Sequence, residues 1–523
     1  MIRRIGNQTS LALCAFLATI SSACADEAGP KPVAEKPYLT IFAASIDRLR
    51  SAYETVFDEA GRPDLSSSLN ETLKSYRDLA GIERTKPLGV MTTWDDVSPA
   101  EIVFVPVDGI NELLKTATFG ILGFHSAGDD HYEIERPGSP YHVIIKKEYA
   151  YFADQVSSIR GLRVTPNSLT QGLRDRYDLV VNYDLRQVPQ PTKTNFIAGI
   201  RREVEPWLQP QDNEAEESAN FRKVLGQLML DLIERAVLDT SMLTFGGRID
   251  PKTHHLNLEV VIESLSKSQM ANSLNRLTTH RSDFSSMIQS DIPAGLALNL
   301  PIGGLVEKIV GSNEGAANKS SGLEAGLQLA GTSIGELSLI AALHGPDTTR
   351  LNDAIPHLIL KLEKSGHFVK VNENFDTHHG VSFHSLTPRE FPTALTQWTG
   401  SNVEIIVGQG QKTIWIGIGQ PAPLLDRLVE AIDRFEESPS NKAPESLVRA
   451  RIQARTFPEL VSKDLLLSDT DTAKEVFSSG DDGFSLTVEP VPNGLKIRLV
   501  FEEGFIRLIG RSWVNQIESS KAR

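Results

Sequence analysis

Residues 256–262 read LNLEVVI and residues 495–501 read LKIRLVF, and these two stretches decide the fold class. Leu256, Leu258, Val260 and Ile262 occupy every second position in the first, and the second repeats the pattern. Such alternation is typical of a strand with one buried and one wet face in an antiparallel sheet. Helices then cover the apolar face, so we expect an α+β protein with mainly antiparallel sheets covered on one face by helices.

The elements expected along the chain follow the same order twice. A strand hairpin followed by a helix is predicted at 242–276 and again at 484–517. The pattern favours an internal duplication, with one α+β unit at 38–285 and a second at 286–523. In the second unit, the spacing of leucine and alanine predicts a helix over 323–330.

The first 25 residues have the layout of a secretory signal peptide. A basic start is followed by the apolar run Leu11–Ile20 and small residues, and cleavage is expected after Ala25. Residues 26–37 are then a flexible lead-in. The predicted location is the periplasm or the cell exterior; in an alternative interpretation Cys24 is retained and lipidated, although Ser21 does not fit a lipidation motif.

Composition excludes several classes of function. The formal net charge is −14, without a long basic run, so nucleic-acid binding is not expected. The two cysteines are Cys14 and Cys24, and cleavage after Ala25 removes both. Thiolate catalysis and cysteine-bound zinc are then excluded for the mature chain. No later apolar run is long enough for a membrane helix, so no integral membrane segment is expected after cleavage.

Two glycine-rich motifs resemble functional motifs but lack the flanking elements or the spacing that those motifs require. Residues 331–335, GTSIG, match the pattern of a nucleophile elbow around Ser333, which needs a strand before the serine and a helix after it. Here a helix is expected before the serine and a strand after it. Residues 408–413, GQGQKT, have too short a glycine spacing for a phosphate loop and predict a hairpin turn. We therefore expect no catalytic residue and no cofactor.

Histidines near acidic residues are candidate metal ligands. The candidates are His125, Asp129, His131, Asp376 and His378. Metal ligands must converge on one point, whereas adjacent residues of a strand face opposite ways. The sequence therefore does not favour a metal at these positions, which fall in predicted turns and strand ends.

The segment GIERTKPLGV at 81–90, followed by IVFVPV at 102–107, resembles uncharacterised exported proteins of Planctomycetes. Residues 40–65 are also similar to that family. The resemblance covers about the first third of the chain and implies an exported bacterial protein, with no activity or site residue attached to it.

Three hypotheses for function follow. The first is a non-enzymatic binding or scaffold protein whose ligand is an unknown protein or small molecule. The second is a hydrolase whose site is assembled from dispersed His, Asp and Glu side chains. The third is a carrier of lipid or another apolar ligand, enclosed by a curved sheet under long helices.

Overall fold

The structure is a computed structural model of the whole chain. It describes residues 36–521 except 76, 95–98, 118–121, 136–139, 210–215, 278–283, 285–286, 301–322, 345–354, 358, 360–367, 438–445, 459–469 and 479–480. The expected signal peptide and most of the lead-in lie outside the described residues.

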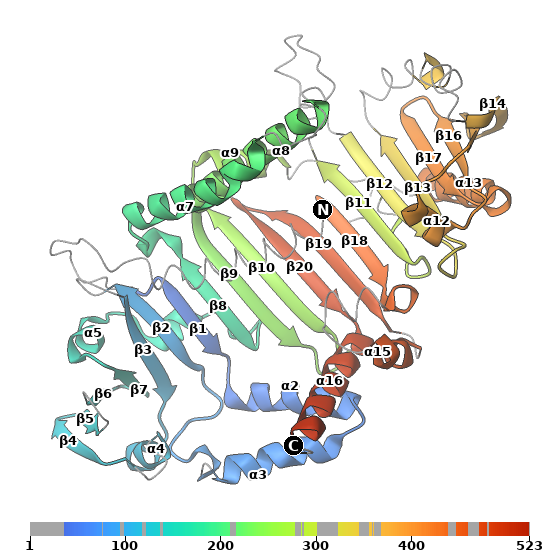
Figure 1. Cartoon of the computed structure of the whole chain (residues 1–523). Coiled ribbons are helices and arrows are strands. Elements are labelled where there is room, and N and C mark those ends of the chain that lie inside the picture. Colours follow the sequence, from blue (N-terminus) through green and yellow to red (C-terminus); the bar gives the residue numbers. More distant parts are fainter. Residues whose placement is uncertain are drawn as a thin grey trace. The chain divides into compact units, whose positions relative to one another are not determined.

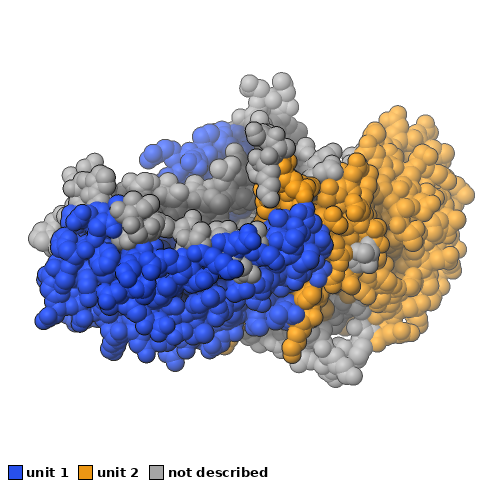
Figure 2. Space-filling model, turned by 90° about the horizontal axis from the view of Figure 1, so that it is seen from below, with its two compact units in different colours: residues 1–251, 258–271 blue, residues 252–257, 272–523 orange. Residues whose placement is uncertain are grey.

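The chain divides into two compact units, shown in two colours in Figure 2. Unit 1 comprises residues 1–251 and 258–271, and unit 2 comprises 252–257 and 272–523. The sequence placed the boundary between residues 285 and 286.

Ten described strands belong mainly to unit 1 (Figure 1). They are β1 (Leu39–Ala43), β2 (Leu88–Trp94), β3 (Pro99–Pro106), β4 (Phe124–Gly128), β5 (His131–Ile134), β6 (Tyr141–Lys146), β7 (Tyr149–Ala153), β8 (Leu179–Asp184), β9 (Thr240–Ile249) and β10 (Leu256–Ser264). Their order in the sheet is β4-β5-β6-β7-β3-β2-β1-β8-β9-β10.

Ten described strands belong to unit 2. They are β11 (Ala294–Leu300), β12 (Leu323–Ala330), β13 (Ser338–His344), β14 (Phe368–His378), β15 (Val381–Pro388), β16 (Glu404–Gln409), β17 (Thr413–Gly419), β18 (Val448–Gln453), β19 (Gly483–Val491) and β20 (Gly494–Phe501). Their order in the sheet is β14-β15-β16-β17-β13-β12-β11-β18-β19-β20.

The described helices lie between these strands and after the last one. They are α2 (Ile46–Glu59), α3 (Pro63–Ser75), α4 (Ile110–Ala117), α5 (Val156–Gly161), α6 (Pro166–Thr170), α7 (Gln190–Leu208), α8 (Glu216–Asp239), α9 (Gln269–Leu277), α12 (Thr393–Thr399), α13 (Pro421–Glu437), α15 (Thr470–Phe477) and α16 (Glu503–Lys521). None of the described helices has both the length and the apolar character needed to span a bilayer.

The α+β class expected from the sequence is confirmed, and every strand pair whose register is described is antiparallel. In the hairpin β19–β20 the register places apolar residues opposite one another, as in the pairs Phe484↔Phe501 and Leu486↔Leu499. At one end the apolar side joins a fully buried core, where Phe484 and Phe501 pack near Phe505 of α16. The remaining apolar residues of this hairpin are half-buried.

Helices do not cover one face alone in the outer part of unit 1. Leu114 of α4 packs with Val143 and Phe152 on one face of β6 and β7. Ile159 of α5 packs in the same core as Ile144, which points to the other face because it neighbours Val143 along the strand. The expectation of helices on a single face is therefore wrong at these two strands, which are buried from both sides.

The helix expected over 323–330 is also wrong, because these residues form β12 between β11 and β13. Gly326 faces the core side chains Phe284 and Met287, so the glycine admits close packing against the strand. Ala325 and Leu327, on either side of it, put apolar side chains on the opposite face. Residues 323, 325, 327 and 329 do alternate with more polar or smaller ones, but Leu323, Leu327 and Ala330 also stand four and three residues apart, so this short run fits both periods.

Candidate metal centre

The outer strands β4, β5 and β6 of unit 1 carry polar side chains on one face. In β5, Tyr132 and Ile134 pack into the apolar core that contains Leu114 of α4. Side chains alternate along a strand, so His131 and Glu133 point to the opposite face. The same alternation that builds the core thus puts a histidine and a glutamate side by side on the other side of the sheet.

Strand register extends this face across three strands. Glu133 lies directly opposite His125 of β4 and directly opposite His142 of β6. Residues in register share a face, with Cβ atoms about 4.5–5.5 Å apart. His125, Glu133 and His142 therefore form one row across the sheet, named here the polar row, with His131 two residues from its centre.

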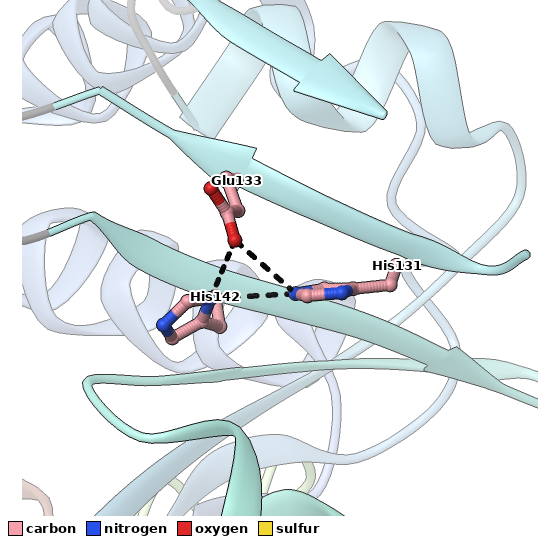
Figure 3. Close-up of side chains that lie close together, drawn as sticks. All are labelled: His131, Glu133 and His142. Carbon is pink, nitrogen blue, oxygen red and sulfur yellow. Dashed lines mark hydrogen bonds and ion pairs between the residues drawn. The ribbon is translucent and has the colours of Figure 1, made fainter. Parts of the chain in front are cut away.

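Three of these side chains converge, as Figure 3 shows. His131 Nε2 lies 3.3 Å from His142 Nδ1, and His142 Nδ1 lies 3.4 Å from Glu133 Oε1. The third side of the triangle, His131 Nε2 to Glu133 Oε1, measures 4.0 Å. All three side chains are shielded, with exposed fractions of 12% for His131, 25% for Glu133 and 16% for His142. We call these residues the His131 group.

The triangle has the size of one face of a metal coordination tetrahedron. Ligand atoms about 2.0–2.1 Å from a tetrahedral Zn²⁺ lie about 3.3–3.4 Å from one another. Both contacts of His142 Nδ1, 3.3 Å to His131 Nε2 and 3.4 Å to Glu133 Oε1, match this spacing, and the third side is longer at 4.0 Å. Two imidazoles and one carboxylate suit Zn²⁺ and other first-row divalent ions better than Ca²⁺ or Mg²⁺, which take oxygen ligands.

The electrostatics of the group keep a nitrogen lone pair available. Burial lowers the pKa of His131 below 6.5, and the neighbouring His142 lowers it further, whereas Glu133 raises it. Arg160 of α5 also lowers this pKa and opposes a cation at the site. A neutral imidazole is the form that binds a metal ion, so His131 is held in the binding form.

His125 contacts the far side of the same glutamate. Its Nε2 lies 3.4 Å from Glu133 Oε2, the oxygen that faces away from the His131 group, and its Nδ1 lies 3.9 Å from Glu135 Oε1. A partner on the second oxygen orients a ligating carboxylate. His125 is therefore placed to position Glu133 rather than to bind an ion with the other three.

The structure places the metal-ligand candidates from the sequence differently with respect to the His131 group. His131 belongs to the group, and His125 reaches it through Glu133, but Asp129 is exposed in the β4–β5 turn outside the group. The sequence argument missed Glu133 and His142. The spacing of His131 and Glu133, two residues apart in a strand, was an available signal; the register of β6 was not.

In unit 2, His378 lies next to His379, and both contact Asp433 of α13. Asp376 lies outside this set. Its carboxylate accepts a hydrogen bond from the backbone N–H of Thr377 at 2.8 Å.

The glycine-rich motifs lie in hairpins. Residues 331–337 connect β12 to β13, so a strand both precedes and follows Ser333, which corrects the helix expected before it. The Ser333 hydroxyl donates to Glu336 at 3.0 Å in an exposed loop. The hairpin turn predicted at 408–413 is confirmed between β16 and β17.

Comparison of the chain with protein families, curated proteins and solved structures finds no match.

Proposed function

We propose that this chain is an exported bacterial protein of the periplasm or cell exterior that binds a divalent transition-metal ion, with Zn²⁺ the best fit to its ligands. The ion is held by His131, Glu133 and His142. The protein is a binding protein built on a duplicated α+β scaffold. This proposal names the ligand class of the binding protein expected from the sequence.

The convergence of the His131 group carries the proposal. Two nitrogens and one carboxylate oxygen lie at 3.3, 3.4 and 4.0 Å from one another on a shielded face of the sheet. One of the two nitrogens must supply the proton of the His131–His142 hydrogen bond. A metal ion replaces that proton and neutralises the glutamate, so binding satisfies all three groups at once.

The duplicated scaffold is supported by strand order. Adding ten to each strand number of unit 1 gives the order of unit 2 from β14 to β20. The helices agree in place, because α5 follows β7 and α13 follows β17. An order with several non-sequential neighbours is improbable for two unrelated units, so a duplication explains it most simply.

Export is supported by the sequence of residues 1–25, and the resemblance to exported Planctomycetes proteins agrees with it. An exported protein without cysteine in its mature part has imidazole and carboxylate as its remaining strong metal ligands, and the His131 group consists of these two types.

Isothermal titration of the chain without its first 25 residues with Zn²⁺ tests the proposal. We expect His142→Asn and Glu133→Gln each to remove one equivalent of bound zinc. The matched controls are His357→Asn and Glu101→Gln, which change an exposed histidine and an exposed glutamate outside the group. Unchanged stoichiometry and affinity in both His131-group variants would refute the proposal.

A metal-dependent hydrolase is a second candidate, favoured by the number of ligands. Three protein ligands leave a fourth tetrahedral position for water, as in catalytic zinc sites, whereas structural sites use four. Ester, phosphate, glycoside and peptide substrates should then turn over with added Zn²⁺, and Glu133→Gln should remove the turnover. Zinc binding without turnover would leave the binding function and exclude this candidate for those substrates.

A further inference from the structure

The turn between β14 and β15 brings two adjacent histidines to the same side. His378 pairs with Val381, so His379 and Gly380 form a two-residue hairpin loop. Their φ angles are 46° and 76°, and positive values at both positions are typical of a type I′ turn. In a continuing strand adjacent side chains would face opposite ways, but the left-handed turn removes that alternation.

The two imidazoles meet at one carboxylate. Their ring centroids are 4.5 Å apart. Asp433 of α13 places Oδ1 2.5 Å from His378 Nε2 and 3.2 Å from His379 Nε2. The three residues, named here the His378 group, thus come from a hairpin turn and from a helix 55 residues later in the chain.

The carboxylate of this group is held in its charged form. The hydrogen bond with His378 lowers the pKa of Asp433, burial opposes this, and the charges of both histidines lower the pKa further. Next along α13, Arg434 pairs with Glu430 and Asp291. In the described part of the chain, the titratable groups in contact with Asp433 are therefore the two histidines.

We propose that the His378 group is a second binding site for a divalent transition-metal ion, independent of the site proposed in unit 1. Its ligands are His378 Nε2, His379 Nε2 and Asp433 Oδ1, again two imidazoles and one carboxylate. The contact of His378 Nε2 with Asp433 lengthens from 2.5 Å to about 3.3 Å when an ion replaces the shared proton. The bound ion ties the β14–β15 turn to α13.

An ion pair between Asp433 and one histidine would not explain why both imidazoles contact this carboxylate. One protonated histidine satisfies one exposed aspartate, and such surface pairs contribute little to stability. Here a second ring converges on the same oxygen, 3.2 Å from His379 Nε2. A divalent ion would give both imidazoles and the carboxylate one common partner, with the imidazoles in the neutral form that binds metal.

Zinc-dependent protection from diethylpyrocarbonate tests the site in the unaltered protein. This reagent modifies histidine nitrogens, and mass spectrometry reports the modification of each peptide. We expect zinc to protect the peptide with His378 and His379 but not the one with His357, which is exposed outside the group. Equal modification with and without zinc would overturn the proposal.

Variants separate this site from the one in unit 1. His379→Asn and Asp433→Asn should each remove one equivalent of zinc in titrations, and Asp426→Asn, an exposed acid of the same helix, should remove none. Adding His142→Asn should remove a further equivalent. If only His142→Asn loses bound zinc, the second site is refuted. If only His379→Asn and Asp433→Asn lose bound zinc, the first site is refuted. Circular dichroism checks that each variant folds.

Discussion

The second strand in the sheet order of each unit shows how one topology carries two kinds of side chain. In β5 of unit 1, Glu133 lies between His125 and His142. In β15 of unit 2, Phe383 lies between Asp376 and Gly408. The first row is polar and partly exposed, and the centre of the second is a fully buried phenylalanine.

The covering helix explains part of this difference. α13 is 17 residues long, and its Leu428 and Ile432 pack in the same core as Phe383. α5 is six residues long, with Arg160 in its last turn near the His131 group. The same strand order thus has an apolar centre at this place in unit 2, so we expect unit 1 to fold without the polar row as well. This supports a binding role for it.

Removing the centre of each row should have unequal effects on stability. Phe383→Ala opens a cavity in a closed core and should lower the free energy of unfolding by about 3–5 kcal/mol. In metal-free protein, Glu133→Gln should change it by less than about 1 kcal/mol, because Glu133 keeps contact with water. Urea unfolding followed by tryptophan fluorescence measures both. Similar losses in the two variants would show that the polar row also holds the fold.

Zinc should stabilise unit 1 by binding to the His131 group. At free zinc a hundred times the dissociation constant, binding to the native state adds about 2.7 kcal/mol. Hydrogen exchange of peptides from β5 and β6 should slow accordingly in the wild type and not in His142→Asn. Equal slowing in that variant would place the stabilising ion elsewhere.

His125 should matter less than the residues that bind the ion. His125→Asn removes the partner of Glu133 Oε2 while leaving all three ligands, and loss of such a partner weakens metal binding about 10–100-fold. Titration against a zinc buffer gives the ratio. A loss of binding as complete as in His142→Asn would make His125 a ligand, and no change would remove its positioning role.

Acid should weaken unit 1 through His131. Its pKa is lowered in the folded protein, so the unfolded chain binds a proton that the folded chain does not as pH falls through about 6.5. The stability of metal-free unit 1 therefore decreases from there toward lower pH, until His131 is protonated in both states. His131→Asn should reduce this decrease, as unfolding measured between about pH 7 and pH 5 will show. An unchanged pH profile would contradict the assignment.

The strand at 495–501 was predictable from the sequence, but the strand at 323–330 was not. The pattern at 495–501 gave β20 because water and core select opposite faces there. The helix predicted at 323–330 is wrong because Leu323, Leu327 and Ala330 have helical spacing, while the pairing with β11 and β13 that makes the segment a strand is not visible in the sequence. Which faces a sheet buries depends on helices elsewhere in the chain.

The candidate sites were only half predictable for a related reason. The histidines at 131 and 378 stood out beside acidic residues, yet their partners His142 and Asp433 come from a neighbouring strand and a distant helix. Register between strands and the docking of a helix are set by tertiary packing. The backbone turn at His379 likewise reverses the rule that adjacent strand residues diverge.

Anomalous scattering at the zinc edge, from crystals grown with Zn²⁺, locates the bound ion in unit 1. We expect an anomalous peak about 2.0–2.2 Å from His131 Nε2, His142 Nδ1 and a Glu133 oxygen. Well-ordered β4, β5 and β6 without a peak among these three side chains would contradict this expectation.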